Sequence, residues 1–482
     1  MAGIGFELKK LFKSNSIVSK LRGSSYAALI TIGPLVLIIV TLFLIYYFLG
    51  YNNILFASRD LLASTILYVF IFSLCTTSPF NSVISRFIAD KIYENDERHI
   101  LPSYYMSLAL NVAVSSVFAL PFCLWMVFVG KINIMYTFVS YSAYIGLVLV
   151  FFSMTYITAL KEYIKIAWAF LIGMGVTLLL GVILARVFGV DISFAIITAF
   201  AVGFLITGFI MFGLIRVFFK ESSNEYLLII DYFKQYWKLI LTNTFYTLGL
   251  YVHNFIFWGS DLRIVVEKSF VSAPIYDMAT CIAMFLNIST MVIFIVEVET
   301  NFHDKYQAYC QAVIGGTGDD ISFAKNEMFA SIRHEFLFVF QLQSVFTLAL
   351  YLLSLILLPS LGIGGIILSI TSSLAVAYLL IFIMYNMVIF IYYFNIYDRA
   401  LITTIIFFVV TVIGTLISKN FTPNLYGIGV LFGAFAGFSY AYFSLRHIEK
   451  NLSYYIFCTG TIANEVVDTK WGHTTYENQY KV

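Results

Sequence analysis

Long apolar stretches recur along almost the whole chain, and they limit its possible folds more than any other feature. A bilayer core about 30 Å thick is crossed by about 20 helical residues, because each residue of an α-helix rises about 1.5 Å. We therefore predict an all-α integral membrane protein with 12 transmembrane helices. The predicted stretches are 24–49, 61–85, 103–129, 137–160, 163–185, 192–215, 237–258, 274–296, 336–359, 365–395, 400–418 and 425–445.

The composition excludes the soluble classes of protein. The 482 residues are 61% hydrophobic and 11% charged, whereas soluble domains carry about 25% charged residues. The 28 Lys and Arg nearly balance the 26 Asp and Glu, so the net charge of +2 indicates no polyanionic partner such as a nucleic acid. The five cysteines form no CxxC pair, which argues against a disulfide framework and a zinc site.

The basic residues predict the orientation of the helices. If the N-terminus is cytoplasmic, 22 of the 28 Lys and Arg fall on cytoplasmic segments, as the positive-inside rule requires. Trp237 and Trp258 bracket the seventh stretch about 31 Å apart, which suits indole rings at the two membrane interfaces. We expect a multi-pass protein of the cytoplasmic (inner) membrane, with both termini in the cytoplasm.

Polar segments divide the chain into parts. Residues 1–23 carry an apolar face beside basic residues, so they predict an amphipathic helix on the cytoplasmic leaflet rather than a cleaved signal. A polar linker separates six predicted helices from six others, which suggests two repeated halves. The expected boundaries are 1–23, 24–219, 220–236 for the linker, 237–445 with a cytoplasmic loop at 297–335, and a cytoplasmic tail at 446–482.

Polar side chains inside the predicted helices are candidates for a substrate path, because a polar group inside a membrane is costly. The alternative for each is a hydrogen bond to a neighbouring helix, worth about 0.6 kcal/mol on average. For Asp277, which follows Pro274 by three residues, helix capping or a surface contact is favoured over ion binding. The candidates are Thr77, Asn81, Asn243, Tyr246, His253, Asn254, Asp277, Asn287, Gln341, Gln343, Tyr385 and Asn386.

No sequence motif indicates an enzyme, a cofactor or a metal site. GGTGDD at 315–320 lacks the Lys-Ser/Thr pair of a phosphate-binding loop and predicts a turn between two short helices. HExxH, GxSxG and paired Cys/His spacings do not occur. All 28 basic residues lie in predicted loops or at helix ends, which favours neutral polar cargo over organic anions. The residues alone therefore predict a transporter.

Six segments of the chain resemble one known family. They are MAGIGFELKKLF, TIGPLVL, SPFNSVISRFIADKIY, FYTLGLYVHNFIFW, APIYD and VETNFHDKYQAYCQAVIGG. Together they are similar to PelG, the family of Pel exopolysaccharide transporters in the multidrug/oligosaccharidyl-lipid/polysaccharide exporter (MOP) superfamily. The resemblance implies two six-helix bundles around a central cavity, and export of an N-acetylgalactosamine-rich polymer during biofilm matrix synthesis. It also implies a cytosolic UDP-sugar glycosyltransferase, PelF, and two membrane partners, PelD and PelE.

The cytoplasmic segments are the expected docking surfaces for this glycosyltransferase. A solvated helix end is the alternative explanation for the two glutamates among the candidates. The candidates at the cytoplasmic entrance are Arg86, Asp90, Glu297, Glu299, His303 and Arg333.

Three other functions stay open at this point. A lipid-linked oligosaccharide flippase of the same superfamily usually needs basic residues within the membrane to hold pyrophosphate. A cation-coupled small-molecule antiporter would depend on an intramembrane acid such as Asp277. A membrane-embedded transferase would have to use acids of an outer loop, for which only Asp261 and Glu267 qualify between the seventh and eighth stretches.

Overall fold

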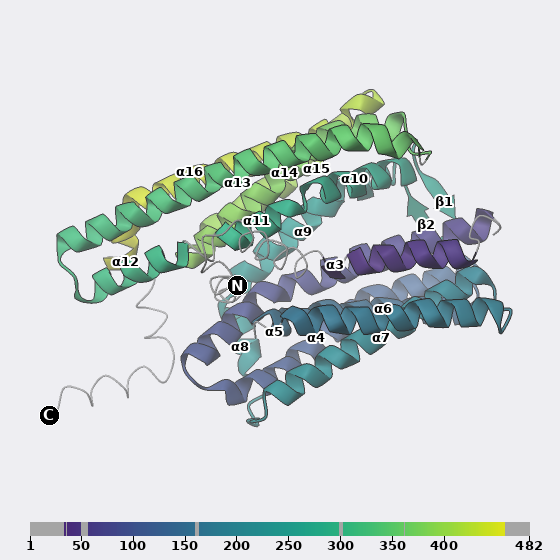
Figure 1. The fold of residues 1–482 in the computed structure, drawn as a ribbon, viewed down its shortest axis with the longest axis horizontal. Coiled ribbons are helices and arrows are strands. Elements are labelled where there is room, and N and C mark those ends of the chain that lie inside the picture. The colour runs from purple at the N-terminus through teal and green to yellow at the C-terminus, as the bar shows by residue number, and fades with distance from the viewer. Residues whose placement is uncertain are drawn as a thin grey trace, which may run out of the picture.

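The helices of the computed structural model lie in two groups, one from each half of the sequence (Figure 1). The described residues are 33–34, 36–49, 56–159, 163–297, 302–360 and 362–457; residues 1–23 and the end of the predicted tail lie outside them. The first half contains α3 (Phe56–Tyr93), α4 (Ile100–Phe128), α5 (Ile134–Ala159), α6 (Tyr163–Arg186) and α7 (Ile192–Phe218). The second half contains α9 (Trp237–Phe257), α10 (Pro274–Asn287), α11 (Ser289–Glu297), α12 (His303–Gly315), α13 (Gly318–Ser360), α14 (Ile366–Tyr393), α15 (Tyr397–Ser418) and α16 (Ile428–Phe457).

Ten helical segments of the described residues are long and apolar enough to cross a membrane. Two predicted stretches fall outside these ten. Over 237–258 the helix α9 forms, but its polar residues Asn243, His253 and Asn254 lower its hydropathy. Of the stretch 24–49, the helix Val36–Leu49 is described, and this piece alone is too short to span. The structure thus supports a multi-pass helical membrane protein.

The segments between the predicted helices contain further short helices. The linker at 220–236 forms α8 (Leu228–Gln235), and the loop at 297–335 contains α12 and the first part of α13. The turn predicted at GGTGDD separates α12 from α13. Thr317 and Asp320 bond reciprocally there: the Thr317 amide donates to Asp320 Oδ2 at 2.9 Å, and the Asp320 amide donates to Thr317 Oγ1 at 3.3 Å. This pair satisfies two amides at the start of α13.

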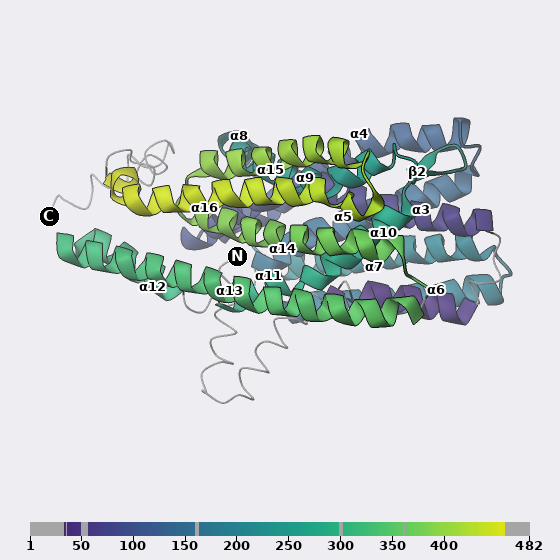
Figure 2. The same ribbon diagram turned by 90° about the horizontal axis from the view of Figure 1, so that it is seen from above.

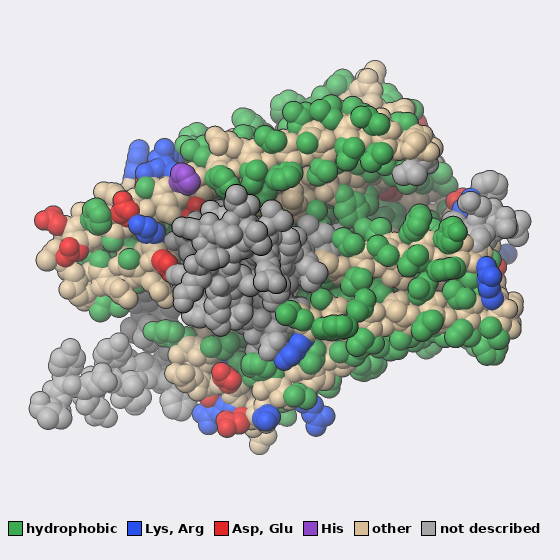
Figure 3. Space-filling model, in the orientation of Figure 1, with side chains coloured by type: hydrophobic (Ala, Val, Ile, Leu, Met, Phe, Trp, Pro, Cys, Tyr) green, Lys and Arg blue, Asp and Glu red, His purple; other side chains and the backbone are tan. Residues whose placement is uncertain are grey.

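The two ends of the molecule differ. α8 and α12 lie toward one end of the helices, the α12 end, and the strands β1 (Ile264–Val266) and β2 (Phe270–Ser272) lie at the other, the hairpin end (Figures 1 and 2). Apolar side chains cover much of the described surface in Figure 3, whereas most charged side chains gather toward the ends. Val117 on α4 and Ile356 on α13 are examples of apolar side chains that are exposed on the helices. Such an apolar surface is suited to contact with lipid tails.

The β-hairpin was not predicted from the sequence. β1 pairs with β2 in antiparallel register, with Val266 opposite Phe270. The turn residues Glu267 and Lys268 both have positive φ, at 47° and 52°. Such turns usually contain Asn or Gly. The Glu-Lys pair is not typical of a hairpin turn, so the sequence did not indicate one here.

Helices approach closely in both halves where small residues meet. A Cβ added to Gly203 of α7 would lie 1.8 Å from Thr177 Oγ1 of α6, and one added to Gly173 of α6 would lie 1.9 Å from Thr207 Oγ1 of α7. In the second half, a Cβ on Gly429 of α16 would lie 2.4 Å from the backbone of Gly414 in α15. Glycine at these crossings lets the backbones pack tightly, which is the main source of attraction between helices in lipid.

Helix α3 joins the two halves along its length. Near the hairpin end the Tyr68 hydroxyl donates to the Val271 carbonyl at 2.8 Å and accepts from the Val271 amide at 3.1 Å. Further along, Asn243 of α9 donates to the Ser78 carbonyl at 3.1 Å and to Ser82 Oγ at 2.7 Å. At the α12 end, Arg86 bonds residues of the second half. The cavity described next lies beside this junction.

Candidate functional site

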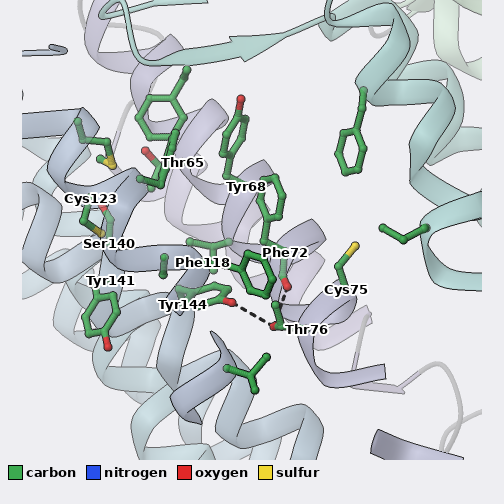
Figure 4. A pocket seen from close by; sticks show the side chains of 18 of the residues that line it. Thr65, Tyr68, Phe72, Cys75, Thr76, Phe118, Cys123, Ser140, Tyr141 and Tyr144 are labelled. Atoms are coloured by element: carbon green, nitrogen blue, oxygen red, sulfur yellow. Dashed lines mark hydrogen bonds between the residues drawn. The ribbon is translucent and has the colours of Figure 1, made fainter. Parts of the chain in front are cut away.

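A cavity of about 570 Å³ lies where the first half meets α9 and the hairpin. Helices α3, α4 and α5 form most of its wall, and α9 and β2 contribute the rest. Figure 4 shows side chains from several helices converging on it. The α3 residues that line it are Thr65, Tyr68, Val69, Phe72, Cys75, Thr76, Pro79 and Phe80.

Helical periodicity aims one face of each helix at the cavity. The α3 lining residues recur every three or four positions, and on α4 the residues Val114, Phe118 and Phe122 recur every four. This spacing puts side chains on one stripe of a helix. On α9 the lining residues include Leu248 and Phe255, and on β2 Phe270. The lining is thus rich in aromatic rings.

The side-chain oxygen atoms of the cavity wall all belong to hydroxyl groups. Tyr144 of α5 lies 3.0 Å from Thr76 Oγ1 of α3 (Figure 4), and Tyr141 lies 2.9 Å from Ser116 Oγ. Among the described residues that line the cavity there is no Asp, Glu, Lys, Arg or His. Pro79 cannot donate to the Cys75 carbonyl, so the wall also contains a carbonyl that lacks its usual helical partner.

The predicted path residues of α3 lie next to the cavity lining but are not part of it. Thr77 follows the lining residue Thr76, is 1% exposed, and its hydroxyl has no hydrogen-bond partner among the described residues. Asn81 is half-buried, and its Oδ1 accepts a hydrogen bond from Thr155 of α5 at 3.1 Å. Both residues therefore face the packing between α3 and its neighbours in this conformation.

Asp277 is the centre of a buried network in the second half. Its carboxylate accepts from Asn254 Nδ2 at 2.7 Å, from Trp258 Nε1 at 3.0 Å and from the Ala273 amide at 3.0 Å. Ala273 is the N-cap residue of α10, which has Pro274 at its first position. The carboxylate thus accepts a hydrogen bond from a backbone amide at the start of α10, where the helix dipole favours negative charge. This contact agrees with the capping role favoured for Asp277.

His253 lies between two tyrosines and is fully buried. Its Nδ1 is 3.0 Å from the Tyr276 hydroxyl, and its Nε2 is 3.2 Å from the Tyr378 hydroxyl. Because Tyr378 donates its proton to the Leu250 carbonyl at 3.1 Å, it must accept from His253, which puts the ring proton on Nε2. Nδ1 then accepts from Tyr276. A neutral imidazole ring therefore has a hydrogen-bond partner at each of its two nitrogens.

A second network surrounds a break in the predicted helix 274–296, which forms α10 and α11 with an interruption at Ile288. Asn287 donates to the Ala375 carbonyl of α14 at 2.9 Å and accepts from Thr347 of α13 at 2.8 Å. Gln343 accepts from Ser289 at 2.8 Å and donates to the Leu286 carbonyl at 3.3 Å. Gln343 thus supplies a donor to a backbone carbonyl beside the break, and the Asn287 side chain joins the break to α13 and α14.

The remaining path candidates occupy three different environments. Tyr246 and Tyr385 stack with ring centroids 4.1 Å apart. Asn386 is fully buried, and neither of its polar atoms has a partner among the described residues. Gln341 is exposed on α13, away from Gln343. None of the twelve candidates lines the cavity, so their role in a substrate path stays a prediction.

The described candidates for the cytoplasmic entrance lie at or toward the α12 end. Arg86 donates to Asn395 Oδ1 at 2.8 Å and to the Tyr397 hydroxyl at 2.9 Å, and it pairs with Asp90 at 3.1 Å. It thereby ties α3 to the segment that joins α14 and α15.

The other candidates at this end have separate surroundings. Arg333 of α13 pairs with Glu449 of α16. Glu297 ends α11 and His303 begins α12, whereas Glu299 lies outside the described residues.

Tyr232 of α8 lies close to Arg86 and Asp90. Burial together with the carboxylates of Asp90 and Glu94 raises the pKa of the Tyr232 hydroxyl, which keeps it protonated.

Solved structures of transporters share this fold. A multidrug resistance MATE family transporter of the MOP superfamily in an outward-facing conformation superposes with a TM-score of 0.58 at 14% identity, over 89% of this chain and 97% of that chain. An inward-facing MATE transporter gives 0.57 at 13% identity, over 81% and 91%. A MOP superfamily transporter from Pyrococcus furiosus gives 0.61 at 12% identity, over 89% and 96%. At these identities the likeness is one of fold.

The sequence itself matches one family. No curated protein sequence matches this chain significantly. The profile of the family PelG, described as "Putative exopolysaccharide Exporter (EPS-E)", matches residues 1–457. The chain therefore belongs to the PelG family, which confirms the resemblance stated from the sequence.

Proposed function

We propose that this member of the PelG family exports an N-acetylgalactosamine-rich exopolysaccharide across the cytoplasmic membrane. The polymer would come directly from a cytosolic glycosyltransferase, and the chain itself would carry out no enzymatic step. The family and the transporter fold support a membrane exporter. The observation that carries the finer proposal is the aromatic, uncharged cavity beside the junction of the two halves.

The chemistry of the cavity suits a neutral sugar polymer. Acetylated hexosamines carry hydroxyl and amide groups but no charge. Aromatic rings such as Phe118 and Tyr144 offer flat apolar faces on which a sugar ring can stack, while tyrosine hydroxyls can hydrogen-bond. The volume of about 570 Å³ lies within the range of about 300–1,000 Å³ that is typical of small-molecule sites. A few sugar units of a longer chain would occupy it at a time.

The proposal assigns the α12 end to the cytoplasm. The excess of basic residues on the segments predicted to be cytoplasmic supports this orientation. Two six-helix bundles with cytoplasmic termini would then surround the path. PelF would dock on the surfaces around Arg86 and α12, and PelD and PelE would be membrane partners. Reversing exposed charges on this side, as in Lys305→Glu with Asp319→Lys, should release PelF in a pull-down, whereas Lys131→Glu at the hairpin end should not.

Export can be measured in inverted vesicles that contain this protein and its glycosyltransferase. Radiolabelled UDP-N-acetylgalactosamine is supplied outside, and a polysaccharide hydrolase is then added. Labelled polymer that resists digestion only when this protein is present would mean that the polymer enters the lumen through it. Complete digestion despite active synthesis would contradict the proposal.

The cavity is tested by a matched pair of variants on α5. Ser140 lines the cavity and is 6% exposed, so Ser140→Phe would fill the cavity with an aromatic ring. Ser142, two residues further on, does not line it, and its hydroxyl donates to the Phe138 carbonyl at 2.9 Å. Protected polymer should fall at least about tenfold in Ser140→Phe and stay near wild type in Ser142→Phe. Equal export by both variants would mean that the polymer does not pass through the cavity.

The second candidate is a cation-coupled antiporter, which the buried carboxylate of Asp277 favours. An antiporter should lose transport when this carboxylate is neutralised. An exporter in which Asp277 only supports α10 should keep transport in Asp277→Asn.

A further inference from the structure

A groove of about 370 Å³ opens on the second half, apart from the cavity beside α3. α13 forms one wall, α16 forms the other, and α14 contributes Ile383 and Met387 between them. α14 packs against both α13 and α16, and Figure 2 shows it between the two. The groove is therefore a cleft between two long helices over a shared neighbour.

The walls of the groove are apolar over most of their length. On α13, Phe329, Ile332, Phe336 and Phe340 recur every three or four residues and so form one helical stripe. On α16 the groove is lined by Phe438, Tyr442 and Leu445. Leu337 on one rim is 61% exposed and Tyr442 on the other is 42% exposed. The groove thus opens on the outer, apolar surface that lipid tails cover.

One end of the groove is cationic. Arg333 of α13 and Arg446 of α16 share the carboxylate of Glu449: Arg333 bonds Oε1, and Arg446 Nη1 bonds Oε2 at 2.9 Å. Arg446 Nε also donates to the Tyr442 hydroxyl at 3.3 Å. Two guanidinium groups against one carboxylate leave a net charge of +1. The side chains of Arg333 and Arg446 are 44% and 46% exposed. Each guanidinium group has five N–H donors, so some of these donors are accessible from outside.

The position of the arginines along α16 matches a membrane interface. α16 begins at Ile428 toward the hairpin end, and Arg446 lies 18 residues further on. At about 1.5 Å per residue this is about 27 Å, close to the hydrocarbon thickness of about 30 Å. Phe438 lies two turns back from Arg446, toward the membrane centre. The guanidinium groups therefore stand at the depth of lipid phosphates, and the apolar groove extends below them.

We propose that this groove binds one anionic phospholipid of the leaflet at the α12 end. The lipid phosphate would contact Arg333 and Arg446, and an acyl chain would lie along the phenylalanine stripe. Charge selects the lipid, because the groove ends in a net positive pair and basic pockets between membrane helices attract anionic head groups. Arginine favours phosphate in particular because its planar donors can bind two oxygens at once. The lipid would connect α13 with α16, and this inference does not depend on the exported cargo.

The test uses the full-length protein in nanodiscs and in detergent. Native mass spectrometry counts bound lipids, and competition between phosphatidylglycerol and phosphatidylcholine measures head-group preference. The variants are Arg333→Gln with Arg446→Gln, and Glu449→Gln. Each arginine should contribute about fivefold to the preference for phosphatidylglycerol, so the double variant should lose about 25-fold in this preference and one bound lipid. Arg98→Gln, an exposed basic residue paired with Asp96, is the control and should change nothing.

Glu449→Gln separates lipid binding from a purely structural ion pair. Removing the carboxylate raises the local charge, so the preference for phosphatidylglycerol should rise or stay equal. Lipid retention by the double arginine variant, or equal losses in Glu449→Gln and the arginine variant, would overturn the proposal. Equal binding of both lipids by the wild type would overturn it as well. Size-exclusion profiles identify any variant that fails to fold. If the double arginine variant fails to fold, the single variant Arg446→Gln is measured instead, and its preference for phosphatidylglycerol should fall about fivefold.

Discussion

The two halves of the molecule use polar side chains in opposite ways. In the first half, α3, α4 and α5 surround a cavity with aromatic rings and paired hydroxyls such as Tyr144 and Thr76. In the second half, the more strongly polar Asp277, Asn287 and Gln343 are buried and bonded to neighbouring helices. The difference teaches that polarity within a membrane helix does not by itself mark a ligand site. Here the buried polar groups of the second half hold irregular helices together, and aromatic rings of the first half form most of the wall of a cavity of about 570 Å³.

The largest expected effect is on the break between α10 and α11. Asn287→Leu removes the donor to the Ala375 carbonyl and the acceptor for Thr347. Buried groups that lose their partners cost about 1–3 kcal/mol each. We expect this variant to lower the thermal unfolding temperature in detergent by several degrees or to prevent purification. Asn420→Ala, at an exposed position after α15, is the control; equal melting of the two variants would mean that the network does not stabilise the second half.

Asp277 should tolerate an isosteric change better than truncation. In Asp277→Asn the remaining oxygen can still accept from Asn254 or Trp258, whereas Asp277→Ala removes the acceptor of the Trp258 indole and of the Ala273 amide. We expect a loss of stability of about 1 kcal/mol for the amide and about 2–4 kcal/mol for alanine. Polymer protection in vesicles should survive in the amide variant. Complete loss of transport with retained stability would instead indicate a coupling carboxylate and sharpen the case for an antiporter.

Tyr144 should act through its ring more than through its hydroxyl. Tyr144→Phe removes the bond to Thr76, which is worth about 0.5–1.5 kcal/mol, but keeps an aromatic face toward the cavity. Export should stay within about twofold of wild type. Tyr144→Ala, which removes the ring, should reduce protected polymer several-fold. The reverse order would show that hydrogen bonding dominates in the first half.

Gln341 should matter least among the predicted path residues. It is exposed on α13, whereas Gln343 is buried in the network around Asn287. Gln341→Leu should change stability by less than about 0.5 kcal/mol, as is usual for exposed positions, and leave export unchanged. Gln343→Leu, made for comparison, should be clearly destabilised. A large effect at Gln341 would place it in contact with a partner.

Sequence reasoning located most of the helices but not the cavity. Length and apolarity predict helices well, because the bilayer imposes one thickness on every span. The break at Ile288 escaped prediction because no proline or glycine marks it. The side chains around it bond Thr347, Gln343 and Ala375 on other helices. The cavity residues Phe72, Phe118 and Tyr144 escaped for a similar reason, since an aromatic stripe looks the same whether it packs in a core or faces an open space.

The sequence by itself determined that this chain lies in a membrane, and its motifs determined its family. These properties depend on composition and on short local patterns, which tertiary contacts do not alter. Only the tertiary structure decided which polar groups meet each other, where space remains between helices, and that Arg333 and Arg446 stand together at one end of a groove. Those properties depend on contacts between residues that are distant in the sequence, from 23 positions for Asn254 and Asp277 to 116 for Arg333 and Glu449, and one sequence does not specify them.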